Sequence, residues 1–348
     1  MEETYVIKIF VITTLSFLVA LFWMPSLLNI LRKNKIGKKI RDEETTPIFS
    51  KLHKKKEGTP TMGGILIWGT VLILSLLFYL LQDVFKSFNL FKNLNFLTQK
   101  ETLLPIGALV ASAVVGLFDD LFNVMKIGAK GGGLRVRHRL IIYTLIATVG
   151  AWWFYYKLDW DIIHVPFMGN FEIGLWYLPV FIFIIVATSH SVNLTDGLDG
   201  LAGGTLLISF AAYGAIAFAQ GRYDLSAFCG AIIGALVAFL WFNINPAKFF
   251  MGDTGSMSLG VTLGIVAMLT NYALLLPVIG FVFVLETGSV LTQITSKKLF
   301  RKKVFLSSPL HHHLEAKGWP EATIVMRFWL LSGISAVVGL ILFFLDKA

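Results

Sequence analysis

The stretch SHSVNLTDGLDGLAGG (Ser189–Gly204) separates two strongly apolar runs, LWYLPVFIFIIVA (residues 175–187) and LLISFAAYGAIAFA (residues 206–219). The runs belong to two predicted membrane spans, and the stretch between them carries Asp196 and Asp199. An unpaired carboxylate close to hydrocarbon is costly, so acidic residues at such positions usually have a function. The stretch therefore points to a membrane protein and raises the question of what its aspartates do.

The whole chain has the composition of a polytopic membrane protein. Of its 348 residues, 56% are hydrophobic, which exceeds the share in ordinary soluble domains. A spanning helix needs about 20 apolar residues, and ten such segments are predicted, forming an all-α protein with a single transmembrane domain over residues 1–348. Their approximate ranges are 5–31, 62–81, 103–121, 138–156, 175–191, 200–219, 224–242, 256–274, 276–296 and 325–345.

The net charge of +9 is explained by the loops between these spans. With Arg139, at the edge of the fourth span, counted in the third loop, the odd-numbered loops hold 22 lysine and arginine residues and the even-numbered loops hold five. Because basic residues concentrate on the cytoplasmic side of membrane proteins, we expect the odd loops in the cytoplasm and both termini outside. Anionic lipid headgroups of the bilayer are the expected partner of this charge, and no nucleic acid is expected.

Five unusual polar clusters fall in or beside the odd-numbered loops. They are therefore predicted to meet at the cytoplasmic face, where we expect the active site, whereas polar residues with purely structural roles would show no such bias. The clusters are KKKEGTPTMGG (Lys54–Gly64), GLFDDLFN (Gly116–Asn123), NLTDGLDG (Asn193–Gly200), NINPAKFFMGDTGS (Asn243–Ser256) and SSPLHHHLEAKGW (Ser307–Trp319).

The aspartates of these clusters indicate a hard metal cation. Mg²⁺ prefers oxygen ligands and completes its coordination with water and substrate phosphate, and it polarises phosphoryl oxygens while a P–O bond breaks. Any single aspartate could instead cap a helix or pair with a loop lysine. Asp196 and Asp199 are three residues apart, so they share a face if their segment is helical. The glycines that follow each of them instead favour a turn. The five are Asp119, Asp120, Asp196, Asp199 and Asp253.

The motif GTPTMGG (Gly58–Gly64) is typical of a helix start. Thr59 is the expected cap and Pro60 the expected first helical residue. Free N–H groups at that helix end, next to three lysines, would attract a phosphate. An ordinary capped helix is nevertheless the preferred interpretation of the motif taken alone.

Three consecutive histidines, His311, His312 and His313, suggest a zinc site at first sight. Consecutive side chains point in different directions, however, and no cysteine or glutamate is found at zinc-ligand spacing. Polar contacts or phosphate binding are therefore expected, with a solvated loop as the alternative. Glu286 lies within a predicted span and is expected to pair with a neighbouring helix or to mark the floor of a cavity.

The residues alone thus predict a membrane-embedded, metal-assisted phosphoryl-group transferase. An active site at the ends of the helices lies at headgroup depth, where a soluble phosphate-bearing molecule can meet a lipid phosphate. Apolar walls between helices could hold the lipid tail. Because residues 193–200 include no lysine or arginine, we expect the acidic cleft to lack a competing cation.

Six motifs make the sequence similar to the phospho-N-acetylmuramoyl-pentapeptide transferase (MraY) family, a branch of the polyprenyl-phosphate N-acetylhexosamine-1-phosphate transferases. They run from residue 58 to residue 333 and are GTPTMGG, the DD pair of GLFDDLFN, NLTDGLDGLAGG, FMGDTGS, PLHHHLEAKGW and RFWLLSG. The resemblance implies ten transmembrane helices, a homodimer, the bacterial cytoplasmic (inner) membrane and Mg²⁺ dependence. It also implies that UDP-MurNAc-pentapeptide gives its phospho-sugar to undecaprenyl phosphate, yielding lipid I and UMP in peptidoglycan synthesis.

The resemblance further implies roles for individual residues. Asp253 is the expected main Mg²⁺ ligand and a catalytic candidate, and Asp119 and Asp120 are catalytic and metal-binding candidates near the lipid phosphate. His312 and His313 are catalytic candidates expected at the pyrophosphate or the sugar-peptide portion. Substrate-binding roles are expected for Lys55, Lys56, Thr59, Thr61, Lys130, Asn193, Asp196, Asp199, Asn243, Phe250, Gln293 and His311. The stretches RDEETTP (Arg41–Pro47) and GGGLRVRHR (residues 131–139) depart from the family pattern, which weakens the assignment of the lysines.

Two other functions are compatible with parts of the sequence. A sister enzyme that transfers GlcNAc-1-phosphate from UDP-GlcNAc would share the acidic residues, but PLHHHLEAKGW favours the muramoyl-pentapeptide branch. A secondary transporter or lipid flippase would place acidic residues at mid-membrane depth in repeat-related broken helices. The sequence leaves open the choice between a one-step and a phospho-enzyme mechanism, the direct metal ligands and the third residue of the pentapeptide.

Overall fold

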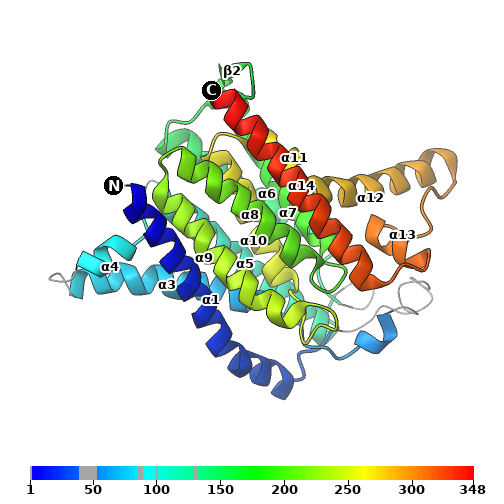
Figure 1. Ribbon diagram of the computed structural model, residues 1–348. Helices are drawn as coiled ribbons and strands as arrows, with labels where there is room; N and C mark the ends of the chain where they lie inside the picture. Colours follow the sequence, from blue (N-terminus) through cyan, green and yellow to red (C-terminus); the bar gives the residue numbers. More distant parts are fainter. Residues whose placement is uncertain (1, 39–52, 85–88, 99–100, 129–131) are drawn as a thin grey trace.

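The computed structural model describes residues 2–38, 53–84, 89–98, 101–128 and 132–348, which form a helical bundle (Figure 1). The long helices are α1 (Glu2–Lys33), α3 (Gly64–Val84), α5 (Leu103–Met125), α6 (Val136–Lys157), α7 (Tyr177–Thr195), α8 (Leu201–Ala219), α9 (Tyr223–Asn243), α10 (Asp253–Leu269), α12 (Phe281–Phe300) and α14 (Glu321–Lys347). The short elements are η1 (Lys54–Lys56), α4 (Asn89–Leu94), β1 (Ile162–Val165), β2 (Gly169–Glu172), η2 (Gly174–Trp176), η3 (Ala273–Leu275), α11 (Leu276–Ile279) and α13 (Leu310–Ala316).

Seven of the described helices are long and apolar enough to cross a membrane. An eighth crossing results if α12 and the segment 273–279 before it, which meet at 81°, count as one span. Helix α6 and the 17-residue α10 lie outside this set. The prediction of a helical polytopic membrane protein is thus confirmed. Each of the ten predicted ranges contains a helix, but seven or eight of the described spans meet the length and composition required for a crossing.

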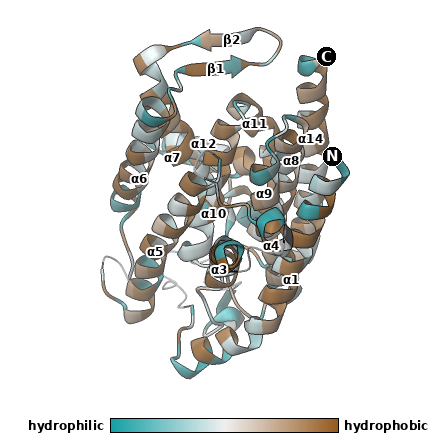
Figure 2. Cartoon of the chain, turned by 90° about the vertical axis from the view of Figure 1, so that its left-hand side faces the viewer, coloured by the Kyte–Doolittle hydropathy of each residue, from teal (hydrophilic) through white to brown (hydrophobic). Residues whose placement is uncertain are grey.

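Apolar side chains cover the outside of the bundle as well as its interior. Phe22 on α1, Phe183 on α7 and Trp241 on α9 are each more than two-thirds exposed. Figure 2 shows hydrophobic residues along the helices and hydrophilic ones mainly at helix ends and in loops. So much exposed apolar surface would be unfavourable in water but is stable in lipid. Lipid offers no hydrogen bonds, so the backbone groups must pair within the helices.

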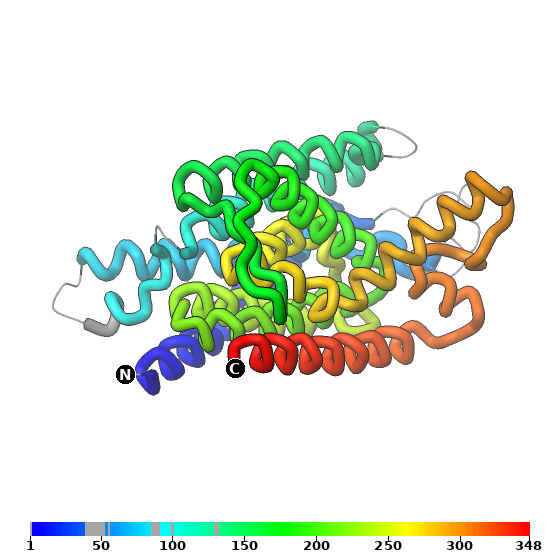
Figure 3. The backbone as a smooth tube through the Cα atoms, turned by 90° about the horizontal axis from the view of Figure 1, so that it is seen from above, coloured from blue at the N-terminus to red at the C-terminus, as the bar shows by residue number. Residues whose placement is uncertain are grey.

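Helix α10 lies in the middle of the bundle, packed against α3, α5, α7 and α8 (Figure 3). Every residue from Thr254 to Leu269 is buried. Its small residues explain the close packing, because a Cβ atom on Gly260 would lie 2.7 Å from Cα of Ser189 on α7. In membranes, such small residues allow helix backbones to approach. Helix α10 therefore sets the positions of the helices around it.

A β-hairpin lies at the end of the bundle that also holds the C-terminus (Figures 1 and 2). Strands β1 and β2 pair antiparallel, and the backbone N–H of His164 donates to Asn271, just beyond the end of α10. Helix α10 is about 25 Å long at about 1.5 Å per residue, so the hairpin and Asp253 mark opposite ends of the bundle. The hairpin is a small addition to an otherwise helical fold and was not predicted, because four-residue strands are too short to produce a recognisable periodicity.

Candidate active site at the start of helix α10

Three aspartates meet where α10 begins. Asp119 and Asp120 occupy the last two turns of α5, and Asp253 is the first residue of α10. The carboxylate of Asp120 accepts the backbone N–H groups of Asp253 and Thr254, both at 3.0 Å. Asp120 therefore caps α10 from a neighbouring helix. A negative group is favourable there, because the N-terminus of a helix has free N–H groups and the positive end of the helix dipole.

Glycines make this close approach possible. Gly252, which precedes α10, has a φ of +74°, and a Cβ atom there would lie 2.5 Å from Asp120 Oδ2. A Cβ atom on Gly116 of α5 would lie 2.6 Å from the carbonyl carbon of Asp253. Gly64, at the start of α3, lies against the backbone of Gly255 in the same way. The glycines of three sequence motifs thus hold three helix ends together around the aspartates.

Arg139 on α6 connects the aspartates from the other side. Its Nε lies 2.6 Å from Asp119 Oδ2, and its Nη2 lies 2.8 Å from Asp253 Oδ2. The amide of Asn193 donates to Asp253 Oδ1 at 2.6 Å. The backbone N–H of Leu134 donates to Asp119 at 2.6 Å. The structure brings the three aspartates and Asn193 together, and because Arg139 lies among them, the prediction of a cleft without a competing cation is wrong.

The carboxylates of this cluster differ in exposure. The side chain of Asp119 is fully buried, whereas that of Asp253 is 13% exposed. Both oxygens of Asp120 accept backbone N–H groups, whereas the contacts of the Asp253 carboxylate within the described part of the chain are to side chains. Carboxylate oxygens at the accessible side of such a cluster are the ligands that Mg²⁺ prefers, so the residues present fit this ion.

A second acidic group lies in the turn between α7 and α8. Helix α7 ends at Thr195 and α8 begins at Leu201, so Asp196 and Asp199 lie in a turn, as their glycines predict. Burial raises the pKa of Asp196 to about 6, an effect that Lys38 opposes and Asp253 strengthens. At neutral pH this carboxyl is therefore easier to protonate than an ordinary aspartate.

Asp199 is almost fully buried and has several partners. Lys56 Nζ lies 2.7 Å from Asp199 and 2.5 Å from Glu321. The side-chain amide of Asn245 donates to Asp199 at 3.0 Å. Lys56, from the first loop, is thus a further cation in the acidic region beside Arg139 and Lys38. No pattern along residues 193–200 could have revealed it.

The GTPTMGG motif has a different role from the one predicted. Helix α3 begins at Gly64, so Thr59 is not its cap and Pro60 is not its first residue. The N–H groups of Gly63 and Gly64 donate to the carbonyls of Phe250 and Met251. They are therefore unavailable to a phosphate. The motif instead joins the start of α3 to the loop before α10.

Several other predicted site residues have structural partners. Phe250 lies beneath the ammonium groups of Lys38 and Lys56, 4.7 and 6.0 Å from its ring centre. Asn243 joins the backbones of Gly200 and Phe249. The backbone N–H of Thr61, a buried residue, donates to the carbonyl of Ile36. The side chain of Gln293 binds the backbone of residues 304 and 305. Lys130 and the side chain of Lys55 lie outside the described residues.

The three histidines lie on α13 and point to three different partners. His311 contacts Glu286 on α12 at 3.0 Å, and both side chains are fully buried. His312 contacts Glu315 at 2.7 Å, and His313 accepts the backbone N–H of Leu306. The expectation that Glu286 pairs with a neighbouring segment is confirmed. The expectation that no glutamate stands beside the histidines at ligand spacing is wrong, since Glu315 is one helical turn beyond His312.

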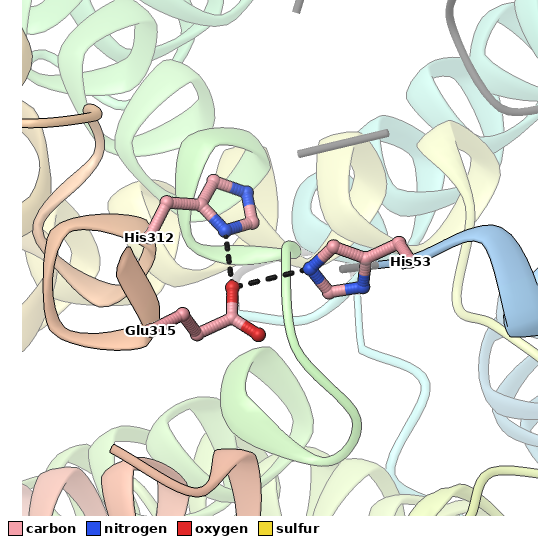
Figure 4. A group of neighbouring side chains, drawn as sticks. All are labelled: His53, His312 and Glu315. Atoms are coloured by element: carbon pink, nitrogen blue, oxygen red, sulfur yellow. Dashed lines mark hydrogen bonds and ion pairs between the residues drawn. The ribbon is translucent and has the colours of Figure 1, made fainter. Parts of the chain in front are cut away.

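A further residue of this region, His53, was not predicted from the sequence. Its Nε2 lies 3.1 Å from Glu315 Oε2, so Glu315 lies between two histidines (Figure 4). Burial, followed by the neighbouring His311, lowers the pKa of His312 to about 3. Burial would raise the pKa of Glu315, but hydrogen bonds from His312 and His53 outweigh this effect and lower it to about 2.

Comparisons with known proteins place this membrane-embedded chain in a class of glycosyl transferases. Residues 102–271 match Glycosyl transferase family 4, and residues 56–67 match the phospho-N-acetylmuramoyl-pentapeptide-transferase signature 1. Curated proteins of that name resemble almost the whole chain. The protein from Chloroflexus aggregans is 40% identical, covering 90% of this chain and 83% of the relative. The protein from Geobacillus sp. (strain WCH70) is 40% identical over 94% and 95%, respectively.

A third relative, from Bacillus anthracis (strain A0248), is 39% identical over 93% of this chain and 94% of its own. Identity at this level over nearly the full length is far above what a shared fold alone requires. The chain belongs to the phospho-N-acetylmuramoyl-pentapeptide-transferase family.

Proposed function

We propose that this protein transfers phospho-MurNAc-pentapeptide from UDP-MurNAc-pentapeptide to undecaprenyl phosphate, giving lipid I and UMP. A phosphate oxygen of the lipid attacks the phosphorus that carries the sugar, and the P–O bond to the uridine-bearing phosphate breaks. The name shared by relatives about 40% identical over nearly the whole chain carries this proposal. The acidic cluster at one end of the bundle supports it, because a soluble nucleotide and a lipid phosphate can meet there.

We propose Mg²⁺ as the cofactor, held by Asp253 and Asp119. When bound, this ion offsets charge on the phosphoryl oxygens during transfer. The donor set supports the choice, since both residues present carboxylate oxygens beside one another. Asp120 binds two backbone N–H groups and would act as a positioning residue that fixes the start of α10 and therefore Asp253.

The remaining charges suit the phosphates of the substrates. Arg139 would hold Asp119 and Asp253 in place and offer its guanidinium to a phosphate oxygen. Lys56, which pairs with Asp199, and Lys38, whose charge acts on Asp196, would attract the pyrophosphate. A phosphate monoester is already largely ionised at neutral pH, so Asp119 need not remove a proton from the lipid substrate.

We further propose the membrane arrangement that the loop charges predict. Ten helices would cross the bacterial cytoplasmic (inner) membrane, with both termini outside and the start of α10 on the cytoplasmic side. In support, the acidic cluster and the β-hairpin lie at opposite ends of α10. We also propose that the protein forms a homodimer, on the strength of the family resemblance.

The deciding experiment measures UMP release by purified protein in detergent with undecaprenyl phosphate. UDP-MurNAc-pentapeptide and UDP-GlcNAc would be compared, with and without Mg²⁺. Asp253→Ala should abolish release, whereas Asp83→Ala, an exposed aspartate near the far end of α3, should not. Release from UDP-GlcNAc alone would assign the sister activity. No release by folded wild-type protein from either substrate would contradict the proposal.

A further inference from the structure

Three metal-ligating side chains meet between the first loop and α13. His53 directly precedes η1, while His312 and Glu315 are one helical turn apart on α13. The three ligand atoms lie within 4.8 Å of one another, and the three residues are well buried. Figure 4 shows both imidazole rings directed at the carboxylate of Glu315. None of these residues belongs to the aspartate cluster.

We propose that His53, His312 and Glu315 form a binding site for a transition-metal ion of the Zn²⁺ class. Two imidazole nitrogens and one carboxylate are a common zinc ligand set, and a water or substrate oxygen usually completes it. Mg²⁺ prefers oxygen ligands alone, so the site would discriminate between the two ions. Metal binding at this site goes beyond the transferase activity and does not depend on it, whereas the positioning role assigned to the ion below rests on the proposed function.

The distances allow an ion to enter with little rearrangement. Glu315 Oε2 lies 2.7 Å from His312 Nδ1 and 3.1 Å from His53 Nε2. Ligands about 2.0–2.1 Å from a tetrahedral zinc are about 3.3–3.4 Å apart. Glu315 and His312 would therefore separate by about 0.6–0.7 Å, and Glu315 and His53 by about 0.2–0.3 Å. The ion would replace the two hydrogen bonds that now join them.

The surroundings favour metal binding over a solvated loop. The side chains of His53 and Glu315 are 5% and 8% exposed, and that of His312 is 12% exposed. The His312 ring packs edge-on against those of His53 and His311. Packing of this kind restricts the rotamers, so ligands are held in place before the ion binds.

The location suggests what the ion would do. His53 lies three residues before Lys56, which pairs with Asp199 and Glu321. An ion shared by His53 and α13 would pin η1 against α13 and hold Lys56 at the acidic turn. We therefore assign the ion a positioning role at the edge of the transferase site.

The experiment measures zinc content by mass spectrometry of protein prepared without a polyhistidine tag. Wild-type protein, equilibrated with Zn²⁺ and desalted, should retain one ion per chain. Glu315→Gln and His53→Gln should each lower the retained zinc at least tenfold. The matched control is His164→Gln, because His164 also contacts a carboxylate, Asp346, at 2.6 Å but lies at the other end of the bundle. That variant should retain zinc.

A second readout covers variants that fold poorly. Zn²⁺ should raise the thermal unfolding midpoint of chelator-treated wild-type protein, and Co²⁺ in its place should give the visible absorption of a four-coordinate site. Folded wild-type protein that retains no zinc would overturn the proposal. Equal zinc in wild type, Glu315→Gln and His53→Gln would also overturn it, by placing the metal elsewhere.

Discussion

Replacing Gly116 by alanine should separate helices α5 and α10 and impair catalysis without unfolding the protein. The added Cβ atom would lie 2.6 Å from both the carbonyl carbon of Asp253 and Cα of Thr254. Carbon atoms in contact prefer about 3.5–4.0 Å. The start of α10 must therefore move by about 1 Å relative to α5.

A shift of this size would break the contacts that position Asp253. The two hydrogen bonds from α10 to Asp120 are 3.0 Å long and would exceed the usual limit of about 3.2 Å. Overpacking of a well-filled interior typically costs about 1–3 kcal/mol, partly offset by the better helix propensity of alanine, about 1 kcal/mol. A displacement of about 1 Å at a reacting centre can lower the rate about 100-fold.

The assay is UMP release under saturating Mg²⁺, with thermal unfolding in detergent measured on the same samples. Gly107→Ala is the matched control, because Gly107 lies on the same helix and a Cβ atom there meets nothing within 4 Å. We expect wild-type activity for Gly107→Ala and a roughly 100-fold loss for Gly116→Ala. Wild-type activity in Gly116→Ala would refute the argument that this close contact sets the position of Asp253.

Three further outcomes are expected. Asp253→Asn keeps the shape of the side chain and should lower kcat/KM by about 100-fold or more, measured by UMP release over a range of Mg²⁺ concentrations, since it removes charge from an electrostatic site. Lys56→Met should lower the thermal unfolding midpoint, because breaking a buried ion pair costs about 3–5 kcal/mol. Lys56→Arg keeps the charge and should show a smaller loss. Equal midpoints for wild type and both variants would contradict the pairing of Lys56 with Asp199 and Glu321. With chelator present, wild-type protein should lose stability as the pH falls from about 6.5 towards 3. The pKa of His312 is lower in the folded protein than the unfolded value of 6.5, so its contribution to the free energy of unfolding is complete above pH 6.5. On acidification this contribution is lost by up to about 1.4 kcal/mol per pH unit. His312→Gln should flatten this dependence of the unfolding midpoint on pH. An unchanged slope would contradict the assignment of the pH dependence to His312.

The helices could be predicted from the sequence because the signal for them is local. An apolar run of about 20 residues is expected to span lipid regardless of its neighbours. The start of α3 could not be predicted as well. Pro60 is a favourable first helical residue, yet the helix begins only at Gly64. Carbonyl groups of the loop before α10 accept hydrogen bonds from the backbone N–H groups of Gly63 and Gly64. A contact with residues far along the chain thus prevailed over local propensity.

The same distinction holds for the candidate site. Asp119, Asp120 and Asp253 stand out in the sequence because carboxylates at the ends of apolar runs are costly. Their partner Arg139 does not, since a basic residue at a predicted helix start is ordinary in a membrane protein. The pairing of His53 with Glu315 joins residues 262 positions apart, and no local pattern reveals it.

The cations answer the question raised by the aspartates of the SHSVNLTDGLDGLAGG stretch. Lys56 neutralises Asp199 from a distant loop, so that aspartate is a partner that anchors the loop as well as a candidate for substrate binding. Around α10, one guanidinium pairs with two of the three carboxyl groups and cannot balance the charge of all three. The balance must come from protons or from a divalent cation. Because an incoming Mg²⁺ would compete with Arg139 for Asp253, substrate phosphate is the natural new partner for the displaced guanidinium. Removal of the positive charge of Arg139 should therefore weaken substrate binding rather than metal binding.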